Sequence, residues 1–293
     1  MPQLIQPRSW REVPVILADG PGDELLSVDR DTVVKCFKTH GVVLFRSFSI
    51  GVEGLQAFVK LYSRTQVSYP GSQRRLVSPD GKVQTVDATS SAIPLHSELS
   101  HTPFRPDVCW FFCVVAPTGG SETILCDGSL LASGLPAPIV NIFEQNMLRY
   151  RRTASTASLQ QLLGMKDAVA LRNYLRDGSY EQFYEIIGKE VRQDFVAPAL
   201  HKAKFLNSPV FANNIIHNFR PGKPMLYPTF ANGCIITEDV IETVRDVAEG
   251  YTFEIHWCDQ DLLMFDNTRF MHGRRAITDP RRTIWTQFSD AGF

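Results

Sequence analysis

Three side chains of metal-binding type stand in a suggestive arrangement: His96 and Glu98 are two residues apart, and His272 lies far downstream. In a β-strand, residues i and i+2 point to the same side, so His96 and Glu98 can face one ion while Ser97 faces away. Two imidazoles and one carboxylate form the facial triad that binds non-haem Fe(II) and leaves the opposite face open for substrate and oxygen. The pattern predicts an iron site, to which a strand folded back nearby contributes His272.

A His-x-Glu triplet alone has little specificity, because such triplets often arise by chance. The specificity comes from four surrounding segments, which are 41–48 (GVVLFRSF), 93–101 (IPLHSELSH), 117–123 (PTGGSET) and 261–282, which includes DLLMFDN, HGRR and PRR. In order and approximate spacing, these segments resemble the taurine dioxygenase-like family of 2-oxoglutarate-dependent oxygenases. The resemblance spans roughly residues 35–290, and segment 117–123 is one residue longer than the element of that family.

This resemblance implies a set of cofactors and ligands. Fe(II) would be bound by His96, Glu98 and His272, with 2-oxoglutarate and O2 as cosubstrates. Most members carry Asp as the acidic ligand, whereas this chain has Glu98. Glu at this place is similar to the branch that contains clavaminate synthase and the syringomycin-pathway aspartyl hydroxylase, which act on amino-acid-like compounds in specialised metabolism. The retained carboxylate argues against a halogenase, in which a small residue replaces the acid.

The resemblance also implies a binding site for the far carboxylate of 2-oxoglutarate. Arginine suits this role because its planar fork pairs with a carboxylate through two hydrogen bonds. Arg281 and Arg282 lie at the family's distance after His272, and Thr123 would supply a hydroxyl. Neighbouring strand residues face opposite sides, so only one arginine can point into the barrel. We favour Arg282, which shares a face with Ile284, and expect Arg281 to be solvated.

Three further polar residues are candidate substrate contacts: Asn213, Asn214 and His101. The two asparagines stand where related enzymes carry an Asn-Gln pair near the pocket, and orienting a substrate and satisfying backbone groups are equally good interpretations. His101 lies five residues after His96 and is a candidate pocket residue. The remaining histidines are expected to be core or surface residues without a metal role; they are His40, His201, His217 and His256.

The other arginines near these segments are expected to have structural or surface roles. Arg274 and Arg275 follow the distal histidine, and pairing with acids near the turn is favoured slightly over substrate binding. Arg74, Arg75 and Arg105 could meet an anionic substrate, but we expect them to be solvated.

Length and composition favour a globular protein that acts on a small molecule. With 293 residues and 44% hydrophobic content, the chain can bury a sizeable core. The net charge is −1 and both signs are interspersed, which argues against nucleic acid or an anionic membrane as partner. The longest apolar run, 108–116, is far shorter than a membrane span. A free substrate and one tethered to a carrier protein are both compatible with the sequence, as is any oligomeric state.

The cysteines and the N-terminus favour a cytoplasmic protein. The six cysteines are scattered, none forms a C-x-x-C pair, and Cys109 and Cys113 share a strand face with Phe111, so we expect buried thiols in a reducing compartment. Residues 1–11 (MPQLIQPRSWR) lack the charged-then-apolar pattern of a signal peptide.

Many short strands and a few helices predict a mostly β fold, and a double-sheet jelly roll fits this pattern. The resemblance specifies it as a double-stranded β-helix. Helical spacing is found at 52–62 and 237–250. Strands are predicted at 42–46, 108–115, 122–126, 147–152, 252–257, 262–265, 269–273 and 283–288. We expect one domain over residues 1–293, in which about 130–207, the least strand-like part, is an insertion that covers the barrel mouth. Its candidate helices are 158–163 and 180–190.

The function expected from these observations is hydroxylation of an amino acid or related small carboxylate, with succinate and CO2 as co-products. Desaturation or oxidative cyclisation with the same cofactors is the alternative. Two different classes also compete. A zinc hydrolase could use the same ligands with a bound water, but it has no need of Thr123 and an arginine anchor. A non-catalytic binding protein on this fold would have no reason to keep all three ligands.

Overall fold

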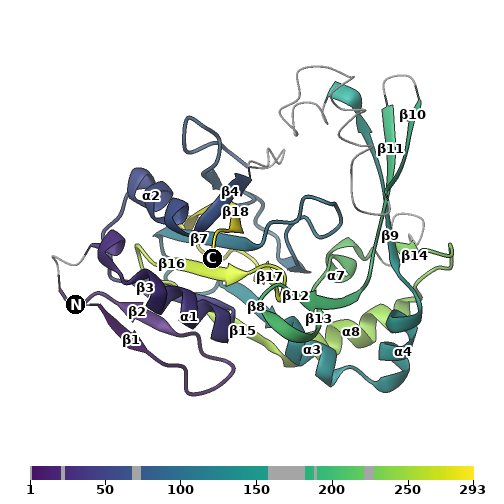
Figure 1. The fold of residues 1–293 in the computed structure, drawn as a ribbon, viewed down its shortest axis with the longest axis horizontal. Helices are drawn as coiled ribbons and strands as arrows, with labels where there is room; N and C mark the ends of the chain where they lie inside the picture. Colours follow the sequence, from purple (N-terminus) through teal and green to yellow (C-terminus); the bar gives the residue numbers. More distant parts are fainter. Residues whose placement is uncertain (1, 21–23, 68–73, 158–181, 188–189, 221–227) are drawn as a thin grey trace.

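Two β-sheets packed face to face form the body of the protein, as the computed structural model shows (Figure 1). The structure describes residues 2–20, 24–67, 74–157, 182–187, 190–220 and 228–293. The larger sheet has eight strands in the order β1-β2-β3-β16-β7-β18-β4, and β5 also pairs with β18. Its strands are β1 (Gln3–Ile5), β2 (Val15–Leu17), β3 (Val42–Arg46), β4 (Ser63–Val67), β5 (Gln84–Thr85), β7 (Val108–Val115), β16 (Leu262–Asp266) and β18 (Thr283–Ala291).

The smaller sheet has four strands in the order β15-β8-β17-β6. They are β6 (Ile93–His96), β8 (Thr123–Asp127), β15 (Thr252–Ile255) and β17 (Phe270–Arg274). Apolar side chains from both sheets meet between them, among them Phe111, Leu125 and Phe265. Cys109 and Cys113 are buried in this interior cluster, as predicted, whereas Cys234 and Cys258 are exposed.

The outer face of the larger sheet is covered by α1 (Arg30–His40) and α2 (Val52–Tyr62). Along β7, Phe111 points between the sheets, while Trp110 and Phe112 pack on the outer side with Phe37 and Phe58. Because both faces of this strand are buried, it is an unbroken apolar run in the sequence rather than an alternating one.

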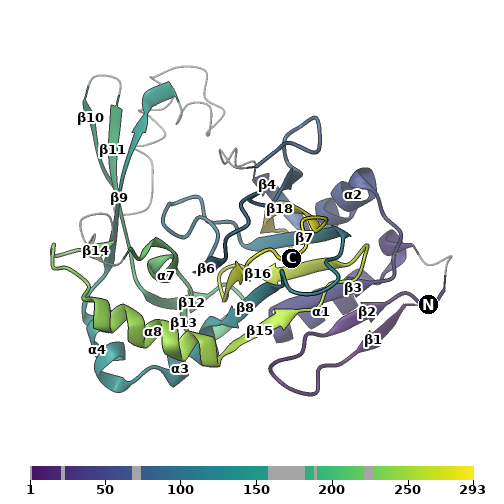
Figure 2. The same cartoon turned by 180° about the vertical axis from the view of Figure 1, so that it is seen from behind.

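A second group of helices covers the outer face of the smaller sheet. Figure 2 shows α3 (Gly128–Gly134), α4 (Ala137–Gln145) and α8 (Glu238–Gly250) on the side away from α1 and α2. Val240, Ile241 and Val244 of α8 pack in one cluster with Cys126 and Met271 of the sheet. Among the helices in the described ranges, none has the length and apolarity that crossing a membrane requires.

The predicted double-stranded β-helix is confirmed, and all eight predicted strands are present to within a few residues at their ends. Both predicted helices, α2 and α8, are present as well. Runs rich in β-branched and aromatic residues between turn residues were sufficient to locate the strands, and helical spacing located the two helices.

The interpretation of 130–207 as the least strand-like segment was wrong. It contains β9 (Leu148–Ser155), β10 (Gln182–Ile187), β11 (Glu190–Ala197), β12 (Leu200–Ala203) and the start of β13 (Leu206–Phe211). In place of the candidate helix 180–190, the described residues form the antiparallel pair of strands β10 and β11, where Tyr184 pairs with Gln193. Antiparallel pairing with β11, which itself pairs with β9, satisfies the backbone there. The candidate helix 158–163 lies outside the described residues.

Strands β9, β10 and β11 form an arm that extends away from the two sheets (Figures 1 and 2). At its base, β9 also pairs with β14 (Thr229–Phe230). The remaining short elements are η1 (Leu25–Ser27) and α7 (Ile215–Asn218). The coverage of the barrel mouth by segment 130–207 stays a prediction.

Gly273 allows β6 and β17 to approach closely beside the predicted ligands. His272 pairs with His96 and Arg274 with Ile93, and the register shifts at Gly273 between them. A Cβ atom on Gly273 would lie 2.5 Å from the carbonyl oxygen of Ile93, which is backbone and cannot rotate away. The glycine in the HGRR segment is therefore required by the spacing of the two strands.

We predict that Gly273→Ala lowers the free energy of unfolding by about 2–3 kcal/mol, because the added methyl group forces two paired strands apart. Urea denaturation of the two proteins would measure the change. Gly250→Ala is the matched control, since a Cβ there meets nothing within 4 Å. Equal stability of the two variants would contradict the close approach of β6 and β17.

Candidate active site

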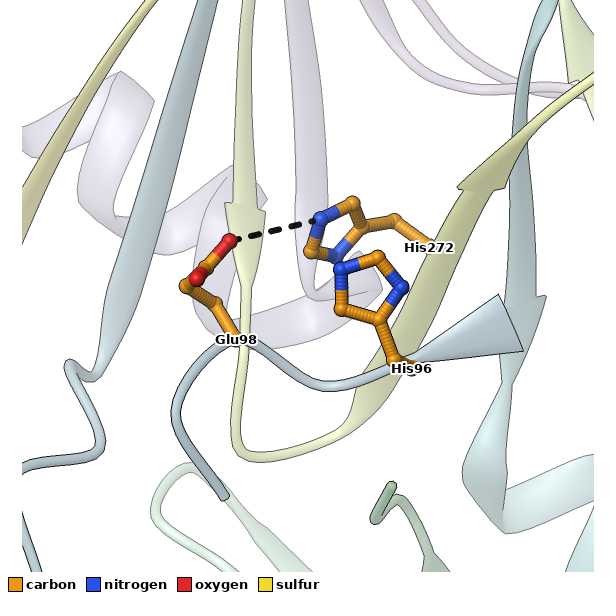
Figure 3. Close-up of side chains that lie close together, drawn as sticks. All are labelled: His96, Glu98 and His272. Carbon is orange, nitrogen blue, oxygen red and sulfur yellow. Dashed lines mark ion pairs between the residues drawn. The ribbon is translucent and has the colours of Figure 1, made fainter. Parts of the chain in front are cut away.

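The three predicted metal ligands lie together in the structure (Figure 3). His96 is the last residue of β6, His272 lies in β17, and the two are paired across the strands. Their ligand atoms and one oxygen of Glu98 are all within 4.8 Å of one another. Nε2 of His272 lies 3.8 Å from Oε2 of Glu98. The fold therefore brings together residues that are far apart in the sequence.

Glu98 reaches this cluster through a turn, and our expectation that strand alternation would place it there was wrong. Strand β6 ends at His96, and Glu98 lies in the turn that follows, in which Leu99 has a left-handed φ of 56°. Ser97 faces away from the ligands, as expected, and its Oγ donates to the carbonyl oxygen of Asn267 at 2.7 Å.

The amide of Asn267, a residue that the sequence analysis did not single out, fixes this turn. Its Oδ1 accepts from the backbone N–H of Glu98 at 2.7 Å, and its Nδ2 donates to the carbonyl of Glu98 at 3.0 Å. Nδ2 also donates to the carbonyl of Pro106 at 2.8 Å. Asn267 is completely buried. One side chain thus holds both backbone groups of a candidate ligand.

Arg105 supports Asn267 from behind and is not the solvated residue that we expected. Its Nε and Nη2 donate to the carbonyl oxygen of Asn267 at 3.2 and 2.6 Å, and its Nη1 contacts Nε2 of His201 at 3.0 Å. Burial lowers the pKa of Arg105 to about 10. The contacts explain the burial, because a buried guanidinium needs acceptors for its donors.

Burial and hydrogen bonding prepare both imidazoles to act as metal ligands. Nδ1 of His96 lies 2.9 Å from the carbonyl of Pro94, to which it can donate, and this leaves Nε2 directed at the cluster. Phe111 and Phe265 pack against the ring of His272, with centroids 5.2 and 5.3 Å away. Burial lowers the pKa of His96 and of His272, so both rings are neutral near pH 7, the form that binds metals.

Arg74 forms an ion pair with Glu98, which corrects the expectation that this arginine is solvated. Nη2 of Arg74 lies 2.9 Å from Oε2 of Glu98, and both side chains are largely buried. Burial acts to raise the pKa of Glu98, but the charge and hydrogen bond of Arg74, together with His96 and His101, outweigh it and hold that pKa below its usual value. The carboxylate therefore stays ionised.

The clustered residues line a cavity of about 360 Å³ that also contains Thr123 and Arg282. Nη2 of Arg282 donates to Oγ1 of Thr123 at 3.0 Å, and Nε1 of Trp257 donates to the same oxygen at 3.1 Å. Burial lowers the pKa of Arg282 to about 10, so it remains charged at neutral pH. A desolvated cation next to a hydroxyl is a suitable site for a carboxylate.

Arg281 is exposed, as expected, but strand alternation is not the reason, because both arginines precede β18, which begins at Thr283. Its side chain is 64% exposed and pairs with Asp279 at 2.8 Å. Asp279 also accepts from the backbone N–H of Thr118, so Arg281 stabilises the contact between two loops.

Of the three candidate substrate contacts, two line the cavity. Asn214 and His101 do so, and Nδ2 of Asn214 lies 2.7 Å from Nδ1 of His101. Asn213 has a backbone role: its Oδ1 accepts from the N–H of Ile215, and its Nδ2 donates to the carbonyl of Ala199. Asn213 lines a second cavity instead.

The cavity contains further residues that the sequence analysis missed or assigned differently. His217, from α7, packs against His96 with ring centroids 4.7 Å apart, and burial lowers its pKa to about 4. Among the described residues Arg274 forms no ion pair with an acid; it donates to the backbone carbonyls of Asp87, Thr89 and Ser91. No local pattern indicates these contacts, because each joins segments far apart in the chain.

Arg275 behaves as expected for a structural residue near the turn. It forms ion pairs with Glu249 at 2.6 Å and with Glu254 at 2.9 Å.

We predict that Asn267→Ala lowers the free energy of unfolding by about 3 kcal/mol, because it leaves several buried polar groups without partners. It should also weaken Mn(II) binding about tenfold to a hundredfold, since Glu98 loses its fixed position. Urea denaturation and electron paramagnetic resonance of free Mn(II) would measure the two effects. Asn232→Ala, at an exposed position, is the control; Mn(II) affinity equal to that of the control would refute the role of Asn267.

Comparison with known proteins places this geometry in a family. The family model described as "Taurine catabolism dioxygenase TauD, TfdA family" matches residues 13–286. A clavaminate synthase-like protein of Arabidopsis thaliana is 21% identical over 264 residues, which cover 83% of this chain and 80% of that protein. The dapdiamide synthesis protein DdaC of Enterobacter agglomerans is 21% identical over 287 residues, which cover 90% of this chain and 86% of that protein.

Solved structures share the fold at low sequence identity. PvcB of Pseudomonas aeruginosa has a TM-score of 0.62 at 15% identity, covering 95% of this chain and 86% of its own. Another structure of PvcB is described as an Fe, alpha-ketoglutarate dependent oxygenase from an isonitrile synthetic pathway. A taurine dioxygenase from Burkholderia xenovorans has a TM-score of 0.63 at 14% identity, covering 100% of this chain and 90% of its own. Since the family model matches nearly the whole chain, the resemblance found in the sequence is confirmed: the protein belongs to the TauD/TfdA dioxygenase family.

Proposed function

We propose that the protein is an Fe(II)- and 2-oxoglutarate-dependent oxygenase that hydroxylates an unactivated C–H bond of an amino acid or related small carboxylate. The proposal rests on one observation: His96, Glu98 and His272 meet in a cavity that also contains Thr123 and Arg282. Membership of a dioxygenase family supports the reaction type.

The three clustered side chains fit a ferrous ion by their chemistry. Neutral imidazoles and a carboxylate suit Fe(II), and three protein ligands leave positions open for a keto acid and oxygen. We therefore assign His96, Glu98 and His272 as the iron ligands. When bound, Fe(II) with 2-oxoglutarate and O2 supplies the oxidation: one oxygen atom converts the keto acid to succinate and CO2, and the other enters the substrate C–H bond.

Thr123 and Arg282 are the proposed anchor for the far carboxylate of 2-oxoglutarate. The hydroxyl oxygen of Thr123 accepts from both Arg282 and Trp257, which uses its two lone pairs. Its own O–H is then available to donate, and a carboxylate next to Arg282 is the acceptor that this arrangement favours. Arg281 has no part in this site because Asp279 binds it outside the cavity.

The rest of the cavity would orient the substrate and limit access of water. Phe111 and Phe265 hold the ring of His272 in place. His101 and Asn214 add hydrogen-bonding groups to the wall. Positioning of this kind is what the protein contributes, while the cofactor carries the hard step.

The assignment to an amino acid or small carboxylate rests on the branch that the sequence resembles. DdaC is named for dapdiamide synthesis and PvcB for an isonitrile synthetic pathway, and both names agree with a small substrate in specialised metabolism. Free and carrier-tethered substrates both fall within the proposal. The six free thiols agree with the reducing cytoplasm in which we place the protein.

The proposed reaction predicts oxygen-dependent formation of succinate from 2-oxoglutarate when Fe(II) is present, stimulated by the right member of a panel of amino acids and small acids. Mass spectrometry of the stimulating compound should show a gain of one oxygen, whereas loss of two hydrogens would indicate desaturation or cyclisation instead. His272→Ala, which removes one proposed ligand, is the control and should abolish succinate formation. Hydrolysis supported by Zn(II), without use of 2-oxoglutarate, would overturn the proposal.

The anchor assignment predicts that Arg282→Gln weakens binding of 2-oxoglutarate about tenfold to a hundredfold, because a charge-assisted pair is lost. Arg281→Gln is the matched neighbour and should change binding by less than about threefold, since exposed pairs contribute little. Calorimetric titration of the Mn(II)-loaded proteins with 2-oxoglutarate measures both. The reverse order of effects would assign the anchor to Arg281.

A further inference from the structure

We propose that Arg74 and Asp87 form a subsite that binds the carboxylate and the ammonium group of a zwitterionic α-amino acid. The inference rests on the proposed function and names the residues that would recognise its substrate. Both residues line the same cavity as His96, Glu98 and His272. They lie outside the segments on which the family resemblance was based.

Arg74 is held in place but retains donors for a ligand. Nη2 pairs with Oε2 of Glu98 at 2.9 Å, and the guanidinium carbon lies 5.0 Å from the ring centroid of Phe288. These two contacts fix its position and orientation. Within the described part of the chain, Nη1 is buried and has no hydrogen-bond partner. A buried donor without an acceptor is costly, and a substrate carboxylate would supply the acceptor.

The other arginines that line the cavity already donate hydrogen bonds to protein groups. Arg274 donates to the backbone carbonyls of Asp87, Thr89 and Ser91, and Arg282 is the proposed anchor of 2-oxoglutarate. Arg74 is therefore the cation that remains for a second carboxylate, and its contact with Glu98 places that carboxylate beside the iron ligands.

Asp87 supplies the opposite charge. Its Oδ1 accepts from the backbone N–H and the hydroxyl of Thr89, which leaves Oδ2 without a hydrogen bond among the described residues. Burial acts to raise the pKa of Asp87, but these hydrogen bonds and the charges of Arg274 and Arg74 outweigh it, so the pKa lies below its usual value. Because Arg274 holds the backbone of this segment, the free carboxylate oxygen is presented from a fixed position.

A fixed cation and a fixed anion that line one cavity match a ligand that carries both charges. A simple carboxylic acid would satisfy Arg74 but leave Asp87 unpaired, and a simple amine would do the reverse. The volume of about 360 Å³ is at the lower end of small-molecule sites, which span about 300–1,000 Å³, so a small amino acid beside 2-oxoglutarate fits best.

The test uses protein loaded with Mn(II) and N-oxalylglycine, an unreactive pair, and calorimetric titration with the twenty common L-amino acids. At least one should bind. Its carboxamide, which lacks the negative charge, and its des-amino acid, which lacks the positive charge, should each bind at least about tenfold weaker. Binding of none of the amino acids would overturn the proposal.

Two substitutions test which residue binds which charged group of the amino acid. Asp87→Asn should weaken binding of the amino acid about tenfold or more and leave the des-amino acid unaffected. Arg74→Gln should weaken binding of both the amino acid and the des-amino acid and leave binding of the carboxamide unaffected. Arg75→Gln and Asp246→Asn, at exposed positions, are the matched controls and should behave as the unmodified protein.

Because Arg74 also contacts Glu98, Mn(II) affinity is measured in each variant, so that an effect on the metal site is distinguished from an effect on amino-acid binding. Asp87→Asn should leave the Mn(II) affinity unchanged, because Asp87 contacts none of the three metal ligands. If Asp87→Asn keeps the full preference for the amino acid over the des-amino acid, the subsite is refuted while the proposed function stands. If the unmodified protein binds neither Mn(II) nor N-oxalylglycine, the proposed function itself fails.

Discussion

The buried amide of Asn267 joins the two chain segments on which the candidate site depends. Asn267 follows β16, and through four hydrogen bonds its side chain binds Ser97, both backbone groups of Glu98 and the carbonyl of Pro106. Because Asn267 is completely buried, a shift of the turn would leave these hydrogen-bonding groups without partners. The cost of that shift fixes Glu98 relative to β17, and therefore relative to His272.

Charge balance around the ligands follows from the same burial. Desolvation keeps the imidazoles of His96 and His272 neutral, and it would also neutralise Glu98 if no cation were close. Arg74 provides that cation, so the three ligands carry one negative charge, which cancels one of the two charges of a divalent metal ion. A buried pair of this type is weak evidence for stability but strong evidence for a site, because its desolvation is costly.

The sequence predicted what depends on local periodicity and missed what depends on contacts between distant segments. Runs of β-branched and aromatic residues between turn residues located β7 and β18. Strand alternation favoured Arg282 over Arg281 for the inner face, and Arg282 lines the cavity although it lies just before β18. The same rule failed for Glu98, since β6 ends before it and a turn takes over. Arg74 and Arg105 looked like surface residues because a buried guanidinium is recognisable only from its acceptors, and these come from remote parts of the chain.

The cavity wall divides into two parts with different origins, and this explains why the family is readable from the sequence and the substrate is not. His272, Thr123 and Arg282 lie in or next to paired strands of the two sheets, where register fixes their positions. Arg74 and Asp87 lie on segments outside the named strands. Groups on paired strands must keep their types for the cofactor chemistry to work, whereas loop residues can change with the substrate at little cost to the fold. Substrate recognition is therefore expected to reside in the loops, and the shared chemistry in the strands and in the turn of Glu98 that Asn267 fixes.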